Sequence, residues 1–322
     1  MQKIIFRADG NSEIGLGHLI RCFALAEMLK DTFEIEFICA SIPDKIRTLF
    51  EHNTYKVSLI ETDADLSQIV NSASLIILDG YHFSSTYQLN LKNKGYLLVV
   101  IDDLHDSVFY ADLIINHAPL MDKNKYLYQN YTHFALGVEY ALLRPSFLAA
   151  ALNQRKIVSI ETVLICFGGS DSKNLTSKVL KACIKNPEFK SILAVTGEAY
   201  QYSDTINSLL ENDNRIEHWH AVNEQTMLDL MLKSDLTIVP SSGILYEVLS
   251  AGCLVASGFY VDNQKGIYEG FKAMNAFYDL ANFDDLNILQ SIQLKDFSKI
   301  QKNIIDGRSS IRLNQKIKAL VS

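Results

Sequence analysis

Short apolar runs alternate with segments of helical periodicity along almost the whole chain, and this alternation constrains the fold more than any other feature. In the first half the apolar runs are Lys3–Phe6, Glu34–Cys39, Lys56–Ile60, Leu75–Leu78, Tyr96–Ile101 and Leu113–Ile115. Helical patterns separate most of them, at Leu19–Leu29, Asp44–Glu51, Asp65–Ser72 and Ser84–Lys94. Continuous apolar runs are typical of parallel strands buried on both faces. The alternation therefore predicts a doubly wound α/β sheet.

The same rhythm restarts after Asn153–Lys156, the segment that we expect to link two domains. Strands are predicted at Thr162–Phe167, Ile192–Val195, Arg215–Trp219, Leu236–Val239 and Leu254–Gly258, and helices at Asn174–Lys185, Ser203–Glu211, Glu224–Lys233, Ile244–Ala251 and Asn263–Met274. A chain of 322 residues is long enough for two domains. We therefore predict two Rossmann-like domains, 1–153 and 154–322. The amphipathic segment Leu294–Leu320 is expected to form a final helix that packs back on the first domain.

The composition restricts the partners of the chain. Hydrophobic residues make up 48% and charged residues 21%, which is typical of a globular protein with a large core. The net charge of −7, without a basic cluster, argues against nucleic acid and anionic lipid and favours a small ligand. We expect no signal sequence, and no membrane-spanning run or CxxC pair stands out in these residues. A cytoplasmic protein without membrane insertion is expected, as a monomer or a weak homodimer.

The first predicted strand runs through a glycine turn into a helix that begins near His18. Gly15 and Gly17 let the backbone approach a ligand closely, and the unpaired amides and positive dipole end of the helix favour an anion. The same field disfavours a protonated imidazole, and a general base must be unprotonated. His18 is therefore the leading catalytic candidate. The alternative is that the two glycines only shape the turn and that His18 caps it.

Polar and titratable residues directly follow several predicted strands of the first half. They are Asp79-Gly80-Tyr81-His82, Asp102-Asp103 and Asn116-His117. Because ligands of doubly wound sheets bind at the carboxyl ends of the strands, these residues are expected to converge on one site. Taken singly, each has another explanation, since Asp and Asn also cap helices and initiate turns.

Three segments of the second half suit a nucleotide. Phe167–Asp171 contains two glycines between a strand and a helix, and its amides suit a diphosphate, although an ordinary turn with a helix cap would look the same. Pro240–Gly243 precedes a helix carrying Glu247, whose carboxylate can accept the hydroxyls of a ribose. Asp262–Gln264 offers side-chain amides to a phosphate or a sugar.

The eight histidines show no spacing typical of a metal site, so neither a metal nor a cofactor is predicted. His218 and His220 share one face of a predicted strand end and are interpreted as structural or partly exposed, with contact to a ligand as the less favoured alternative. No GxSxG elbow, P-loop or kinase motif is present.

The order and spacing of several segments resemble a known family. The segments are Phe6–Asp9, Ile14–Cys22, Leu78–Tyr81, Ile101–Asp103, Tyr140–Arg144, Phe167–Asp171 and Asp262–Gln264. Together they are similar to the UDP-sugar hydrolases of the pseudaminic acid pathway. The resemblance implies a GT-B fold, with two Rossmann-like domains facing each other across a cleft, and UDP-2,4-diacetamido-2,4,6-trideoxy-β-L-altropyranose as substrate. Gly10-Asn11 departs from the serine-rich sequence expected there, and nothing after Phe271 matches.

The resemblance also implies a mechanism, in which water attacks the anomeric carbon without a metal and releases UDP and the free sugar for nonulosonic acid synthesis. The histidine of the GxGH motif, here His18, is the implied base. The residues implied to surround the sugar or the water are Asp9, Gly15, Gly17, Arg21, Tyr81, Asp103 and Arg144. Those implied to bind UDP are Gly168, Gly169, Ser242, Gly243, Glu247, Asn263 and Gln264.

Two other function classes fit the same fold. One is a glycosyltransferase with a UDP-sugar donor, which would need an acceptor pocket and would be favoured by exposed apolar residues near the first-domain site. The other is a non-catalytic nucleotide-sugar binding protein. The presence of His18 counts against it, since binding alone has no use for a base.

Overall fold

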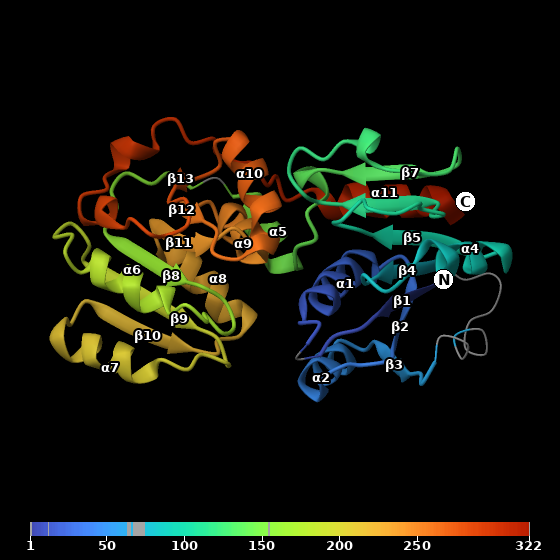
Figure 1. Ribbon diagram of the computed structural model, residues 1–322, viewed down its shortest axis with the longest axis horizontal. Helices are drawn as coiled ribbons and strands as arrows, with labels where there is room; N and C mark the ends of the chain where they lie inside the picture. The colour runs from blue at the N-terminus through green and yellow to red at the C-terminus, as the bar shows by residue number, and fades with distance from the viewer. Residues whose placement is uncertain (1, 12, 63–65, 67–74, 154, 322) are drawn as a thin grey trace. The chain divides into compact units, whose positions relative to one another are not determined.

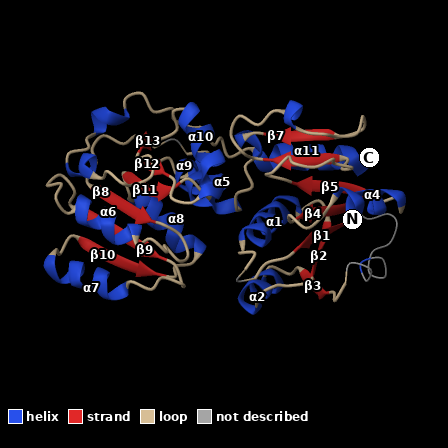
Figure 2. Cartoon of the chain, viewed as in Figure 1, coloured by secondary structure: helices blue, strands red, loops and turns tan. Residues whose placement is uncertain are grey.

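The computed structural model describes residues 2–11, 13–62, 66, 75–153 and 155–321. The chain divides into two compact units, the first formed by Met1–Pro145 and Arg308–Ser322 and the second by Ser146–Gly307. Each unit contains one β-sheet of parallel strands with helices packed against it (Figure 1), and strands alternate with helices along most of each unit (Figure 2). The predicted α/β class with two Rossmann-like units is confirmed.

The first unit has a seven-stranded sheet in the order β3-β2-β1-β4-β5-β6-β7. Its strands are β1 (Lys3–Ala8), β2 (Glu34–Cys39), β3 (Lys56–Leu59), β4 (Leu75–Asp79), β5 (Leu97–Ile101), β6 (Leu113–Asn116) and β7 (His133–Leu136). Its α-helices are α1 (Gly17–Leu29), α2 (Asp44–His52), α4 (Ser85–Asn93) and α11 (Ser309–Val321). The helix predicted at Asp65–Ser72 lies outside the described residues, apart from Leu66.

The second unit has a six-stranded sheet in the order β10-β9-β8-β11-β12-β13. Its strands are β8 (Thr162–Cys166), β9 (Ser191–Thr196), β10 (Ile216–His220), β11 (Leu236–Pro240), β12 (Leu254–Gly258) and β13 (Tyr278–Asp279). Its α-helices are α5 (Pro145–Ala151), α6 (Leu175–Cys183), α7 (Ser203–Asn212), α8 (Glu224–Lys233), α9 (Gly243–Ser250) and α10 (Lys265–Ala273), and the short 3₁₀ turn η3 (Asp262–Gln264) precedes α10.

The strand order of each sheet reverses direction once. In the first unit β1 lies between β2 and β4, and in the second unit β8 lies between β9 and β11. The loops after the two central strands of such a sheet lead to opposite faces and leave a crevice between them. The topology therefore directs attention to the loops after β1 and β4 in one unit and after β8 and β11 in the other.

The core of each unit lies against the faces of its sheet. Ile5, Ile76 and Ile114 in the first unit, and Val163 and Ile238 in the second, have no exposed surface. All five residues of β4 are buried. A strand covered on both faces needs apolar side chains at successive positions, which explains why these strands read as continuous apolar runs.

The last helix returns to the first unit, beside α1. Leu313 and Ile317 of α11 are fully buried, and the Asn314 side-chain amide donates to the Thr32 hydroxyl at 3.1 Å. The segment predicted as one helix, Leu294–Leu320, is instead a 3₁₀ turn at Leu294–Phe297 followed later by α11. Gly307, with a φ of +70°, lies before α11 in a left-handed conformation that a continuous helix cannot contain.

The boundary between the units also differs from the predicted 153/154, because the structure divides at Pro145/Ser146. Helix α5 explains the difference. Phe147 and Leu148 are buried, and the Ser146 hydroxyl donates to the Glu224 carboxylate of α8. The helix that precedes the predicted linker is therefore part of the second unit.

Two short strands were not predicted. β7 follows the polar, tyrosine-rich stretch 121–133 and forms the edge of the first sheet, and β13 forms one edge of the second. β7 has four residues of which only Ala135 is buried, and β13 has two residues, so neither provides an apolar run long enough to predict a strand. None of the described helices combines the length and the hydropathy that crossing a membrane requires.

Leu313→Ala is expected to lower the free energy of unfolding of the first unit by about 2–5 kcal/mol, because it leaves a cavity beneath α11. Ile311→Ala is the matched control, since Ile311 lies on the same helix and is 59% exposed. Urea unfolding followed by circular dichroism measures the effect. Trp219, the single tryptophan, reports on the second unit, whose midpoint should not move. Equal shifts for both variants would contradict the placement of α11.

Candidate active site

The loop between β1 and α1 is held by Asn11. The Asn11 side-chain oxygen accepts hydrogen bonds from the amides of Glu13 and Ile14, both at 2.9 Å, and its backbone oxygen accepts from the amide of Gly15 at 2.9 Å. Gly15 has a φ of +85°, a conformation that favours glycine. The sequence after β1 therefore closes into a tight turn, and α1 starts at Gly17 with His18 as its second residue.

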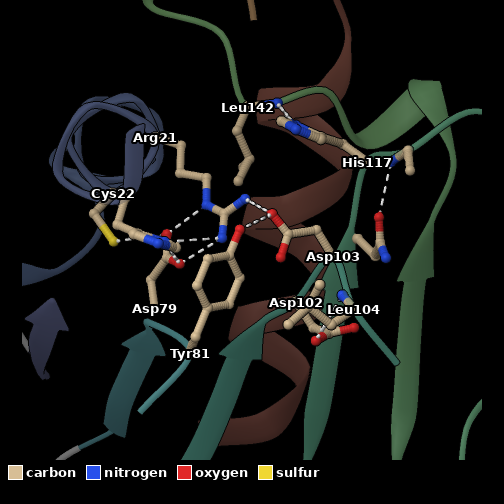
Figure 3. Close-up of polar contacts among 12 residues, drawn as sticks. Arg21, Cys22, Asp79, Tyr81, Asp102, Asp103, Leu104, His117 and Leu142 are labelled. Atoms are coloured by element: carbon tan, nitrogen blue, oxygen red, sulfur yellow. Dashed lines mark hydrogen bonds and ion pairs between the residues drawn. The ribbon is translucent and has the colours of Figure 1, made fainter. Parts of the chain in front are cut away.

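The His18 imidazole contacts a buried carboxylate at the end of β4. Its Nδ1 lies 2.7 Å from Asp79 Oδ1, and the Asp79 side chain has no exposed surface. Arg21, one turn further along α1, donates to the same carboxylate through Nε and Nη2, both at 2.6 Å (Figure 3). Helix α1 is thus tied to β4 through one carboxylate that serves both side chains.

Arg21 extends the network to the ends of β4 and β5. Its Nη1 donates to Asp103 Oδ2 at 3.0 Å, and the Tyr81 hydroxyl donates to the same oxygen at 3.1 Å (Figure 3). The Tyr81 ring stands nearly perpendicular to the His18 imidazole, at 83°, with ring centroids 4.8 Å apart. We call His18, Arg21, Asp79, Tyr81 and Asp103 the His18 cluster.

The charges of the cluster are set by its pairing. Burial by itself would raise the pKa of the Asp79 carboxyl, but the charge and hydrogen bonds of Arg21 and the bond to His18 outweigh it and hold that pKa below its usual range. Burial and the neighbouring Asp103 raise the pKa of Tyr81 to about 12. At neutral pH the cluster therefore contains an ionised Asp79 and a protonated Tyr81.

Asp9 lies in a different group from the His18 cluster. Its carboxylate accepts hydrogen bonds from the amides of Ala40 and Ser41 at 2.6 and 3.1 Å and from Arg7 at 2.7 Å, and His82 Nε2 lies 3.2 Å away. The residue is only 5% exposed. In this structure Asp9 connects the end of β1 to the end of β2.

The segment before α5 passes the carboxyl end of β6. The amide of Leu142 donates to His117 Nδ1 at 3.0 Å (Figure 3), and Arg144 follows two residues later. Burial and the charge of Arg21 lower the pKa of His117 to about 4, so this imidazole is neutral at pH 7. Arg144 is half-buried at this end of the first unit.

The glycine loop after β8 is shaped by close backbone contact. Gly168 has a φ of +83°, and the Gly169 carbonyl accepts a hydrogen bond from the amide of Ala199 at 3.2 Å. The Asp171 carboxylate accepts from the amides of Leu175 and Thr176, both at 2.8 Å. The Asp171 side chain therefore caps the first amides of α6. This is the arrangement expected if the loop is an ordinary turn with a helix cap and not a diphosphate site.

Helix α9 begins differently. Ser242 precedes it without a side-chain cap, and Gly243 is its first residue. Ser241 is turned inward, with its hydroxyl 3.1 Å from that of Ser257 on β12. Uncapped amides and the positive dipole end of a helix favour an anion. Glu247 is half-buried one turn inside this helix.

The loop after β12 lies beside the loop after β8. The Tyr260 hydroxyl donates to the Phe167 carbonyl at 3.4 Å, and the Lys173 ammonium donates to the Tyr260 carbonyl at 2.7 Å. The Gln264 side-chain oxygen accepts from the amide of Tyr260 at 3.0 Å, while Asn263 is exposed on η3. The structure thus brings two of the three predicted nucleotide segments together.

Among the predicted first-unit residues, the structure brings His18, Arg21, Tyr81 and Asp103 into one cluster. The strand-end rule found Asp79 but assigned it no role. Its partner Arg21 lies on the helix after another strand, so only the tertiary fold reveals the pairing. Arg21, Tyr81 and Asp103 also line a small cavity of about 70 Å³ at the ends of β4 and β5.

His218 and His220 share the buried hydroxyl of Thr196, at 2.8 and 3.1 Å. Within the described residues, no group of three or more histidine, cysteine or acidic side chains could hold a metal ion.

Comparisons with known proteins identify distant relatives. No protein-family model matches the chain. An uncharacterized protein of Methanocaldococcus jannaschii is 28% identical over 84% of this chain. The aligned segment covers only 58% of the length of that relative. The spore coat polysaccharide biosynthesis protein SpsG of Bacillus subtilis is 25% identical, with 95% of each chain covered. The UDP-2,4-diacetamido-2,4,6-trideoxy-beta-L-altropyranose hydrolase of Campylobacter jejuni is 24% identical over 82% of this chain and 93% of that protein.

Solved structures establish the fold class. MurG of Acinetobacter baumannii matches with a TM-score of 0.61 at 13% identity, covering 98% of this chain and 95% of that one. Anabaena Alr3699/HepE in complex with UDP matches with a TM-score of 0.58 at 13% identity, covering 99% of each chain. The protein has the GT-B fold. It is a distant homologue of SpsG and of the Campylobacter jejuni hydrolase.

Asp9→Asn is expected to lower the free energy of unfolding at neutral pH by about 3 kcal/mol, because it removes the carboxylate that pairs with the buried Arg7 guanidinium at 2.7 Å. The pKa of Asp9 is held below its ordinary value of 3.8, since the bond from His82 and the charge of Arg7 outweigh burial. The ionised carboxylate therefore stabilises the fold above that value, and the contribution is lost as the pH falls below it.

Urea unfolding between about pH 5 and about pH 3 measures this dependence. Wild-type stability should fall with acidification more steeply than that of Asp9→Asn. Asp31→Asn, at an exposed position of the same unit, serves as control. Parallel curves for wild type and Asp9→Asn would show that Asp9 does not stabilise the fold through its charge.

Proposed function

We propose that the protein is a UDP-sugar hydrolase that cleaves a UDP-linked 2,4-diacetamido-2,4,6-trideoxy sugar without a metal, by attack of water at the anomeric carbon. The observation that carries the proposal is the His18 cluster, in which an imidazole, two carboxylates, a guanidinium and a phenol meet at the carboxyl ends of β1, β4 and β5. Homology to the Campylobacter jejuni hydrolase supports the substrate class.

The proposed reaction needs one general base. As the water oxygen bonds to the anomeric carbon, the water proton moves to His18, and the bond from that carbon to the phosphate oxygen breaks with its electron pair leaving on UDP. UDP carries the charge over several oxygens, so its departure needs stabilisation of the diphosphate more than protonation. Tyr81 and Asp103, with Gly15 and Gly17 leaving the backbone bare, are proposed to surround the sugar and the water.

The second unit is proposed to bind UDP. The amides after Ser242 at the start of α9 and the backbone of Gly168 and Gly169 would face the diphosphate. Glu247 would accept hydrogen bonds from the ribose, and Asn263 and Gln264 would contribute amides. Arg21, Asp9 and Arg144 are proposed to serve the sugar side of the site, the first two by holding its geometry.

The test is an incubation with a panel of UDP-sugars in 18O-water, followed by mass spectrometry. Label in the free sugar and none in UDP is the expected result, because the water oxygen bonds to carbon. Label in the phosphate would show cleavage at phosphorus and overturn the mechanism. Addition of EDTA should leave the rate unchanged; a complete loss that a divalent ion restores would contradict the metal-free reaction.

A GT-B glycosyltransferase is the second candidate, and one observation favours it. Ile14 and Leu16, in the loop before His18, are 47% and 41% exposed, and Tyr81 is 64% exposed. Exposed apolar side chains beside the site could contact an acceptor. This candidate predicts that UDP appears only when an acceptor is supplied, so the incubation without acceptor separates the two.

His18→Asn is expected to lower turnover about a hundredfold or more while leaving the dissociation constant of UDP nearly unchanged, because a base acts in the transition state. Steady-state kinetics and calorimetric titration with UDP measure the two quantities. His52→Asn, at an exposed position of α2, is the control. Equal losses of turnover and UDP binding would remove His18 from the role of base.

Glu247→Ala is expected to weaken UDP binding by roughly 1.5–3 kcal/mol, the range for hydrogen bonds to a charged group, and to raise KM more than it lowers kcat. Calorimetric titration with UDP decides the matter. Glu211→Ala, at an exposed position of α7, should bind UDP as the wild type does. An unchanged affinity in Glu247→Ala would leave the ribose contact without support.

A further inference from the structure

We infer that Asp79 is a positioning residue that fixes the tautomer of His18, placing the proton on Nδ1 and the basic lone pair on Nε2. The catalytic meaning of this inference rests on the proposed function, but the tautomer itself can be measured independently. Three features of the His18 cluster support the inference. They are the direction of the hydrogen bond between His18 and Asp79, the charge of Asp79, and the packing of the Tyr81 ring against the imidazole.

The contact direction follows from what each atom can do. An ionised carboxylate only accepts hydrogen bonds, so the 2.7 Å contact requires His18 Nδ1 to donate. With the proton on Nε2 instead, two lone pairs would face each other at that distance. Arg21 Nη2 also lies 3.2 Å from Nδ1, a contact that is a hydrogen bond only if Nδ1 accepts. The contacts to Asp79 Oδ1 are shorter, at 2.7 Å from Nδ1 and 2.6 Å from Nη2, and a carboxylate is the stronger acceptor, so they favour Nδ1 as a donor.

The charge of Asp79 is fixed by Arg21. Two hydrogen bonds of 2.6 Å join the guanidinium to the two carboxylate oxygens, and the Cys22 thiol lies 3.5 Å from Oδ2 (Figure 3). A bidentate pair fixes the plane of the carboxylate as well as its charge. Arg21 in this way keeps Asp79 from competing with His18 for the proton that water loses.

The imidazole is held from a second side by Tyr81. Its ring stands at 83° to the imidazole, and its hydroxyl is anchored on Asp103, which is in turn bound by Arg21. The His18 side chain is only 7% exposed. The bond from Nδ1 to Asp79 and the packing of the Tyr81 ring against the imidazole both orient Nε2 in the absence of a ligand.

The Asp79 carboxylate is also placed to stabilise the protonated form of His18. When His18 accepts a proton, the new positive charge lies beside a carboxylate that is already ionised and already oriented. No reorganisation is then needed to stabilise it. Replacing Asp79 by a neutral amide would remove this stabilisation and allow the amide nitrogen to donate to Nδ1, which would move the proton to Nε2.

The direct test is nuclear magnetic resonance of the full-length chain labelled with 15N at histidine, recorded at mildly alkaline pH. The spectrum of His18→Asn identifies the His18 signals among those of the eight histidines. The expected result is a protonated Nδ1 and an unprotonated Nε2. A protonated Nε2, or a mixture of the two forms, would overturn the inference whatever the enzyme hydrolyses.

Variants then connect the tautomer to turnover. Asp79→Asn is expected to show protonated Nε2, with kcat lowered about a thousandfold or more and KM changed by less than about threefold. Asp103→Asn removes the other carboxylate from Arg21 without touching His18, so its tautomer should stay as in the wild type. Asp79→Glu restores an anionic acceptor and should recover part of the lost turnover.

Each outcome has a distinct meaning. Wild-type turnover in a folded Asp79→Asn would overturn the positioning role, even with the expected tautomer in the wild type. If Asp79→Asn does not fold, the wild-type spectrum and Asp79→Glu decide the question. Full activity of His18→Asn, or no cleavage of any UDP-sugar, would reject the proposed function and leave the measured tautomer standing.

Discussion

The candidate site of the first unit depends on the buried charge of Asp79. Asp79 has no exposed surface, and a carboxylate in that position is stable only when it is paired and hydrogen-bonded. Arg21 supplies the pairing, which ties α1 to β4 and, through Asp103, to β5. Because the same pairing brings His18 against the carboxylate, the interaction that secures the helix also builds the candidate site.

The two units share a sheet topology, but the loops at the carboxyl ends of their strands differ in residue type. Each sheet reverses its strand order at the centre and leaves loops at the carboxyl ends of the strands on either side. In the first unit these loops carry titratable side chains that bind one another. In the second they carry glycines, serines and an uncapped helix start, where backbone amides are the available donors. The first arrangement suits proton transfer and the second suits an anion.

Elements buried on both faces could be predicted from the sequence, because their burial imposes apolar residues at successive positions. Glu34–Cys39 and Leu254–Gly258 were predicted with the bounds that the structure has. The edge strands β7 and β13 lack that signal, and the amphipathic pattern of Leu294–Leu320 does not show that α11 begins only at Ser309. For the site, the strand-end rule selected the segments that converge, but it did not predict which side chains pair: Asp9 binds amides of Ala40 and Ser41, and Arg21 binds Asp79. Hydrogen bonds between distant segments depend on the tertiary fold.

The position of α11 has a consequence for the order in which the protein matures. The segment that covers α1 follows the second unit in the sequence, so the residues before Ser146 emerge from the ribosome without the helix that buries part of their surface. The second unit is complete once residue 307 has emerged, although it follows the larger part of the first unit in the sequence. The first unit is thus completed only after the whole second unit has been synthesised, and helix α1, which carries His18, is covered by a segment that lies far from it in the sequence.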